Sequence, residues 1–267
     1  MSDEPVLLSL EGAIATLTLN RPAALNALDE AMADALYAAL VRVEHHKEAR
    51  CMVVRVAGDG FMAGGDAQAF ARAVGELSPA DRQPACEQIV GRAHATILAL
   101  RHLPLPVVAA LHGDVAGFGV SLVLASDLAI AADDARFTLG DCQIGTSPHG
   151  GATFHLPRNL GMKRAMAMAL LGDRIDAATA ERIGLVNRVV PAASLDAEVA
   201  TLAARLASGP TGAYARTKEL LTAAFDHNLA THLGWECDRF VASTATADFA
   251  EGVTALVEKR PPSFHGR

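Results

Sequence analysis

The chain contains 267 residues, carries a formal net charge of −7, and is 51% apolar with 4% aromatic residues. This acidic balance provides no basic footprint for nucleic acid, and the composition is typical of packed α/β layers. Ser121, Ser126 and Asp127 interrupt the apolar run 115–132. We therefore expect a buried helix and strand there and no membrane span.

The first two thirds of the chain alternate strands with helices. Apolar residues alternate around Gly12 over residues 6–19, which predicts a hairpin of two strands. Asp29 precedes a stretch of helical apolar periodicity, so a helix is expected to reach about His46. Residues 67–85 are weakly patterned and contain one glycine and two prolines, and we expect them to be mobile. Further strands are predicted at 51–57, 107–111, 128–131 and 137–139, and further helices at about 86–102 and 120–125.

The last third is dominated by helical periodicity, with one short strand predicted at 185–190. This order predicts an α/β fold, a layered core followed by a helical C-terminal subdomain. We place the core and its site in residues 1–195, and the helical subdomain, suited to subunit contacts, in residues 196–267. The helices are predicted at 162–171, 177–183, 195–208, 214–225 and 229–257.

The four cysteines are far apart and form no Cys-x-x-Cys pair. A zinc site or a disulfide framework is therefore not expected, and a reducing compartment fits. The start, MSDEPVLLSL, lacks the apolar core of a signal peptide. These features predict a cytoplasmic location and no bound metal.

Two glycine-rich segments, 58–66 and 113–119, each lie between a predicted strand and a predicted helix. Glycine lets backbone N–H groups approach a ligand, and a following helix N-terminus adds positive potential. Two such loops facing each other would form a two-donor oxyanion hole. Each loop alone is weak evidence, because glycine turns before helices are common and usually structural. The third glycine of the dinucleotide-binding fingerprint is missing after Gly60.

Four side chains near these loops could act as acids or bases. Asp66 is expected to cap a helix, and Asp114 fits a plain turn residue. Asp141 and His149 differ, because both lie on the irregular segment 140–151. From spacing alone, each could be catalytic or structural.

Several short segments in this order and spacing resemble the crotonase superfamily, the enoyl-CoA hydratase/isomerase family, over nearly the whole chain. The resemblance implies a repeated ββα core, a homotrimer or dimer of trimers, and an acyl-CoA substrate. It implies no metal or redox cofactor, since CoA arrives with the substrate. The matching segments are Asn20-Arg21-Pro22, Leu25 to Leu28, Phe61 to Asp66, Pro106 to Ser126, Ile144 to Pro148, Leu160-Gly161, Leu171 to Ile175, Gly184 to Val186 and Glu258 to Arg260.

The resemblance also implies roles for individual residues. The two oxyanion N–H donors fall on Gly65 and Phe118, where Phe118 replaces the glycine that is usual in the family. Its side chain must then point away from the thioester or shape the acyl pocket. Lys259 matches a position that can reach a neighbouring subunit's nucleotide. With Lys259, the residues assigned to substrate and CoA binding are Ala23, Ala24, Leu25, Ala63, Gly64, Asp66, Gly117 and Ser121.

The departures from the family pattern concern the carboxylates. Hydratases of the family place one glutamate just after the second glycine loop and another about twenty residues later. Those positions are Ser121 and Asp141 here. His149 matches a position where relatives that act on aryl-CoA substrates carry a catalytic aspartate, and it fits either a base or a loop histidine.

With one carboxylate, proton shuttling of the enoyl-CoA isomerase type is mechanically simpler than hydration. Asp141 is then the base and His149 its helper. The alternatives are a hydratase that uses Asp141, His149 and water, or a non-catalytic acyl-CoA binder. An RNA-binding role, known for some relatives, is disfavoured by the net charge of −7.

Overall fold

The computed structural model describes residues 4–266, so the first three residues of the segment tested for a signal peptide lie outside it. A six-stranded sheet forms the centre, and its first strand is antiparallel to the second while the others are parallel. The predicted hairpin is therefore confirmed. The strands, in spatial order, are β1 (Val6–Glu11), β2 (Ile14–Leu19), β3 (Cys51–Val56), β4 (Val107–Leu111), β6 (Leu128–Ala132) and β9 (Arg188–Val190).

The core also contains a second, small sheet. It consists of β5 (Asp114–Ala116), β7 (Arg136–Thr138) and β8 (Ile175–Asp176). Sequence analysis placed β5 in a loop and missed β8, because strands of two or three residues show no measurable alternation. The isolated bridge between Met62 and Val115 joins this sheet to the first glycine loop.

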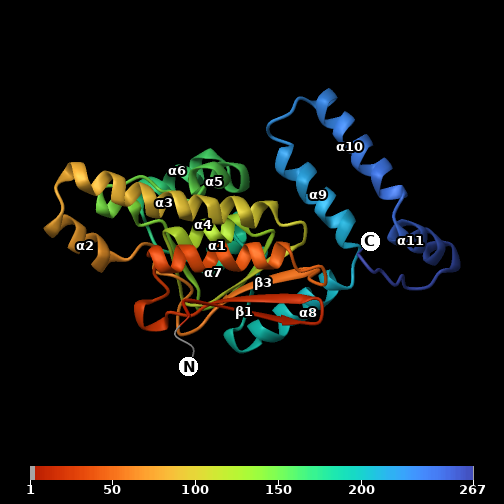
Figure 1. Cartoon of the computed structure of the whole chain (residues 1–267), viewed down its shortest axis with the longest axis horizontal. Helices are drawn as coiled ribbons and strands as arrows, with labels where there is room; N and C mark the ends of the chain where they lie inside the picture. The colour runs from red at the N-terminus through yellow and green to blue at the C-terminus, as the bar shows by residue number, and fades with distance from the viewer. Residues whose placement is uncertain (1–3, 267) are drawn as a thin grey trace.

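Both faces of the large sheet are covered by helices. The helices α1 (Glu30–Glu44) and α3 (Pro79–His102) lie over one face, and α8 (Leu195–Ala207) lies on the other (Figure 1). Alternate residues of β3 point to opposite faces. Met52 therefore joins the main core, whereas Val53 packs in a separate cluster with the α8 side chains. Burial on both faces explains why the inner strands are continuously apolar.

Residues 67–85, which show only weak periodicity in the sequence, are mostly helical. It contains α2 (Ala67–Glu76) and the start of α3. Ser78 caps α3 by accepting a hydrogen bond from Asp81 N at 3.3 Å. Pro79 occupies the first helical turn, where no backbone N–H is needed. The proline that suggested a break thus starts a helix.

The core contains several further helices. They are α4 (Phe118–Ala125), α5 (Ala152–Leu160), α6 (Met162–Leu171) and α7 (Ala177–Ile183), with short 3₁₀ helices η1 (Pro22–Ala24), η2 (Asp141–Ile144) and η3 (Ala192–Ser194). The helix α4 is buried along its whole length. Among residues 4–266, none of the helices has the length and apolar character needed to cross a membrane.

The last three helices project from the core as an arm (Figure 1). They are α9 (Thr211–Ala223), α10 (Leu229–Thr244) and α11 (Ala247–Glu258). The single helix expected over 229–257 is interrupted because the Thr246 hydroxyl caps α11, accepting from Phe249 N at 3.2 Å. Large apolar side chains are exposed on the arm. They include Leu221, Phe225, Leu229, Leu233, Phe240, Val253 and Leu256.

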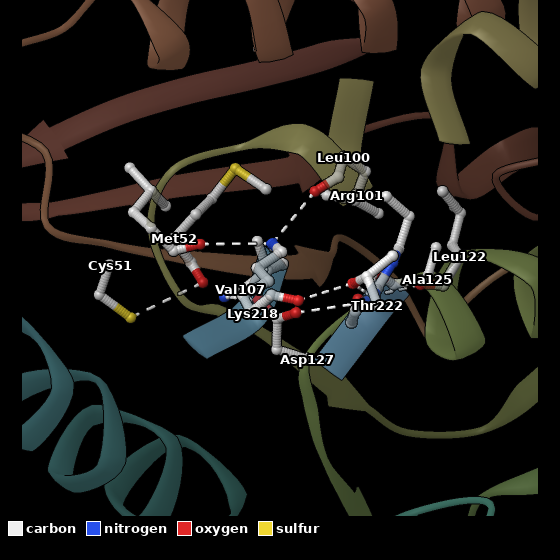
Figure 2. Close-up of polar contacts among 12 residues, drawn as sticks. Cys51, Met52, Leu100, Arg101, Val107, Leu122, Ala125, Asp127, Lys218 and Thr222 are labelled. Atoms are coloured by element: carbon white, nitrogen blue, oxygen red, sulfur yellow. Dashed lines mark hydrogen bonds and ion pairs between the residues drawn. The ribbon is translucent and has the colours of Figure 1, made fainter. Parts of the chain in front are cut away.

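An ion-pair network, which we call the arm clamp, ties α9 to the core (Figure 2). Lys218 Nζ lies 2.8 Å from Asp127 Oδ2, and Arg101 Nη1 lies 3.3 Å from Asp127 Oδ1. Asp127 Oδ2 also accepts from Val107 N at 2.9 Å, and Arg101 Nη2 donates to Thr222 Oγ1 at 2.6 Å. One aspartate therefore holds α3, β4 and α9 together.

We expect Lys218→Met to lower the free energy of unfolding by about 3 kcal/mol, because removal of one partner leaves a largely buried carboxylate with a weaker counter-charge. Lys163→Met, the same change at an exposed position of α6, is the matched control. Urea unfolding at fixed protein concentration measures both variants. Equal stabilities would show that the arm clamp contributes no more than a surface ion pair.

Candidate active site

The first glycine loop is held by parallel bridging to the segment before α1. Leu28 N donates to Gly64 O at 2.7 Å, and Asp66 N donates to Leu28 O at 3.1 Å. Gly65 lies between these bonds, so its N–H points away from Leu28. Within residues 4–266, Gly65 N has no hydrogen-bond acceptor. This amide is therefore available to a ligand.

The second loop is positioned by strands on both sides. Ala116 N donates to Met62 O at 2.7 Å, and Gly117 N donates to Thr138 O at 3.0 Å. The chain then turns at Gly117, with φ +48°, directly into α4. Phe118 is the first residue of that helix, and its N–H has no acceptor within the described part of the chain.

The two loops touch each other. A β-carbon on Gly117 would lie 3.2 Å from the Cα of Gly64, so larger residues would push the loops apart. Two unbonded amides on adjacent loops, one at a helix N-terminus, are the elements that an oxyanion hole needs. The donor roles of Gly65 and Phe118 stay predictions.

The Phe118 side chain points into the protein. It is 1% exposed, and its ring stacks on the His149 ring with centroids 5.6 Å apart and planes inclined by 11°. The ring also lies against Gly150, where an added β-carbon would come within 2.7 Å of it. The Phe118 side chain thus packs against the segment 149–150.

Ser121 and His94 both bind the segment 149–150. The buried Ser121 hydroxyl donates to His149 O at 2.7 Å, and Gly150 N donates to His94 Nε2 at 3.2 Å. The rings of His94 and His149 lie with centroids 6.1 Å apart. Burial, and next the proximity of His94, lowers the pKa of His149, which favours its neutral form.

Asp141 begins η2, three residues after Thr138, the residue that binds the second loop. Its Oδ2 is buried and has no hydrogen-bond partner among residues 4–266. Burial raises the pKa of this carboxyl above its usual value. His149 Nδ1 is likewise buried without a partner. Unpaired buried polar atoms are uncommon and mark places where a ligand can bind.

A cleft of about 330 Å³ opens beside both loops. It brings together Leu25 and Ala63, two of the residues assigned to CoA binding, and adds Ala116 and two arginines, Arg136 and Arg174. Arg174 forms an ion pair with Asp114 on the same cleft wall. The cleft combines apolar walls with charged groups of both signs, because Asp59 and Asp114 line it together with the two arginines.

Asn26, which is fully buried, anchors the segment that carries Leu25. Asn26 Oδ1 accepts from Arg21 N at 2.8 Å, and Nδ2 donates to Ala57 O at 3.0 Å and Gly60 O at 3.2 Å. Ala23 and Ala24 lie in η1 just before this anchor. Leu25 is left 65% exposed at the cleft with φ +52°.

Two residues assigned to substrate and CoA binding, Asp66 and Lys259, do not line this cleft. Asp66 caps α2, as expected, because its Oδ1 accepts from Gln68 N at 2.9 Å and Ala69 N at 3.0 Å. Lys259 ends α11 on the arm. The role of Lys259 towards the nucleotide of a neighbouring subunit stays a prediction.

Four residues at or near the site have no signal in the sequence that points to them: His94, Phe70 and the two cleft arginines. The Phe70 ring lies over Gly65, 2.6 Å from where a β-carbon would be. His94 falls one residue after a buried position of α3, a pattern shared by many surface histidines. Phe70 lies in the weakly patterned segment 67–85, so no periodicity pointed to it. No group of three or more metal-binding side chains occurs in the part of the chain that the structure describes.

Comparison with known proteins agrees with this architecture. The family model for enoyl-CoA hydratase/isomerase matches residues 9–267. The chain is 37% identical to a probable enoyl-CoA hydratase of Rhodobacter capsulatus over 100% of both chains. It is 36% identical to the 1,2-epoxyphenylacetyl-CoA isomerase of Escherichia coli over 99% of both.

A crystal structure from Mycobacterium abscessus, assigned as an enoyl-CoA hydratase/isomerase, superposes with a TM-score of 0.92 at 34% identity, covering 98% of this chain and 100% of that one. The crotonase-like fold with its helical C-terminal region is thus confirmed. The chain belongs to the enoyl-CoA hydratase/isomerase family of enzymes.

Proposed function

We propose that this enzyme moves a proton within a CoA thioester through an enolate, as an enoyl-CoA isomerase does. The observation that carries this proposal is the state of Ser121. Its hydroxyl is buried and already bonded to His149 O at 2.7 Å. The family resemblance assigns two carboxylates to hydration, and Ser121 occupies the position of one of them. Asp141 is then the single carboxylate of the pair in this chain.

Carbonyl activation would come from the two unbonded amides. The thioester oxygen would accept hydrogen bonds from Gly65 N and Phe118 N, and negative charge would gather there as the C2 proton leaves. Donors that are already oriented stabilise such charge without reorganisation, and the α4 N-terminus adds to the effect.

Asp141 would remove the proton from C2 and return it to C4. A carboxyl whose pKa is raised by burial is a stronger base once ionised, which suits this task. His149, kept neutral by its lowered pKa, would orient the carboxylate or the acyl group without adding charge. One base suffices, because the same proton can move between the two carbons.

The alternative is hydration assisted by His149. The buried and unpartnered His149 Nδ1 favours this alternative, because it could orient a water molecule. The two reactions differ in product: isomerisation converts a 3-enoyl thioester to a 2-enoyl thioester, whereas hydration yields a 3-hydroxyacyl thioester.

The cleft beside the loops would hold the CoA moiety, with Arg136 and Arg174 near its phosphates. The exposed apolar side chains of the arm support assembly into a trimer or dimer of trimers, in which Lys259 of one chain reaches the CoA bound by another. The cytoplasmic location expected from the cysteines stays a prediction.

The first test is Asp141→Asn assayed with 3-enoyl and 2-enoyl thioesters. We expect kcat for isomerisation to fall by about 10² to 10⁴, the usual contribution of a general base. Asp238→Asn, an identical change at an exposed position of α10, should leave kcat unchanged. Full turnover by Asp141→Asn would remove Asp141 from the mechanism, and a 3-hydroxyacyl product would favour the hydratase.

The pH profile provides a second test. Asp141 must be ionised to act as a base, and burial raises its pKa. Activity should therefore be present above this raised pKa and lost as the pH falls through it, at a pH above that of an ordinary aspartate. Measurement of kcat/KM against pH should show this acid limb, and the limb should vanish from the residual activity of Asp141→Asn.

The third test concerns CoA. Arg174→Ala should raise KM for CoA thioesters about fivefold with little change in kcat, since an exposed charge contributes roughly 1 kcal/mol. The N-acetylcysteamine thioester of the same acyl group lacks the nucleotide and should show no change. Arg205→Ala on α8 is the control for loss of one exposed arginine. An equal rise for both thioesters would place CoA elsewhere.

A further inference from the structure

The peptide group between His149 and Gly150 is bound at both of its polar atoms. Its C=O accepts from Ser121 Oγ at 2.7 Å, and its N–H donates to His94 Nε2 at 3.2 Å. The two side chains come from different helices, α4 and α3. We call this arrangement the peptide clamp.

His94 acts in the clamp as a hydrogen-bond acceptor. Its Nε2 accepts from Gly150 N at 3.2 Å. A ring nitrogen accepts through its lone pair, so the bond is made when Nε2 carries no proton.

Close packing makes the clamp specific to glycine at position 150. Gly150 has φ +69°, and an added β-carbon would lie 2.7 Å from the Phe118 ring and 2.9 Å from Ser121 Cβ. The peptide can approach α4 only because this residue has no side chain. The His149 ring then stacks on Phe118, 5.6 Å between centroids.

We propose that His94 is a positioning residue: together with Ser121 it holds the His149–Gly150 peptide, and so keeps the His149 ring stacked on Phe118. This inference rests on the proposed function, in which Phe118 N binds the thioester oxygen. His94 acts through that peptide and needs no contact with substrate. Ser121, at a position where hydratases of the family carry a glutamate, serves the same clamp as the donor.

Two amide variants separate this role from a general structural one. In His94→Gln the amide oxygen is as many bonds from Cα as Nε2 is, so an acceptor can still reach Gly150 N. In His94→Asn it is one bond shorter and cannot. His102→Asn, an exposed histidine in the last turn of the same helix, is the matched control.

We expect His94→Asn to lower kcat about tenfold with KM for the CoA thioester unchanged, since a small displacement of reacting groups affects rate more than CoA binding. His94→Gln should retain most of the activity, and His102→Asn all of it. Equal kcat for the Asn and Gln variants, or a change confined to KM, would overturn the proposal.

Hydrogen–deuterium exchange of the segment 149–151 tests the clamp without any turnover. The Gly150 amide should exchange faster in His94→Asn than in the wild type, and His94→Gln should restore its protection. Wild-type exchange in His94→Asn would refute the clamp. If the wild type turns over no thioester while the exchange pattern holds, the proposed function fails and the clamp stands.

Discussion

Gly64 and Gly117 meet with only 3.2 Å between the Cα of one residue and the place where a β-carbon of the other would be. Both have positive φ, +92° and +48°, a conformation that residues with side chains rarely adopt. The contact brings two loops from distant parts of the sequence together at one end of the sheet. Gly65 and Phe118, whose amides have no acceptor among residues 4–266, each follow one of these two glycines in the sequence.

The supports of this contact are distributed over the core. The bridge at Leu28 carries the first loop, the strand β5 carries the second, and Asn26 holds the exposed turn at Leu25. The first two supports use backbone hydrogen bonds between segments far apart in the chain, and the third uses the side-chain amide of Asn26. Such a site retains its geometry only while the surrounding core is intact, and rigid backbone donors favour stabilisation of developing charge.

Behind the second loop, Ser121 is buried and tightly packed. Its Cβ and the Phe118 ring lie close against Gly150, and its hydroxyl donates to His149 O. A glutamate side chain in place of Ser121 would have to displace the peptide clamp. Asp141, which begins η2 after β7, has a buried carboxylate oxygen with no hydrogen-bond partner among residues 4–266.

Local pattern determined much of this protein. The hairpin at β1 and β2, the buried strand β3, the cap at Asp29 and the glycine loops could be predicted, because alternation, capping and turn chemistry act over a few residues. The order of several short motifs indicated the family.

The tertiary structure decided what depends on distant contacts. His94 contacts the segment 149–150 and Phe70 contacts the first glycine loop, both from helices that no sequence pattern linked to the site. Arg174, which follows α6, lines the cleft. Pro79 looked like a helix breaker but starts α3, since its effect depends on its place in the turn. The unpaired state of Asp141 and the lowered pKa of His149 both arise from burial, which only the packed chain creates.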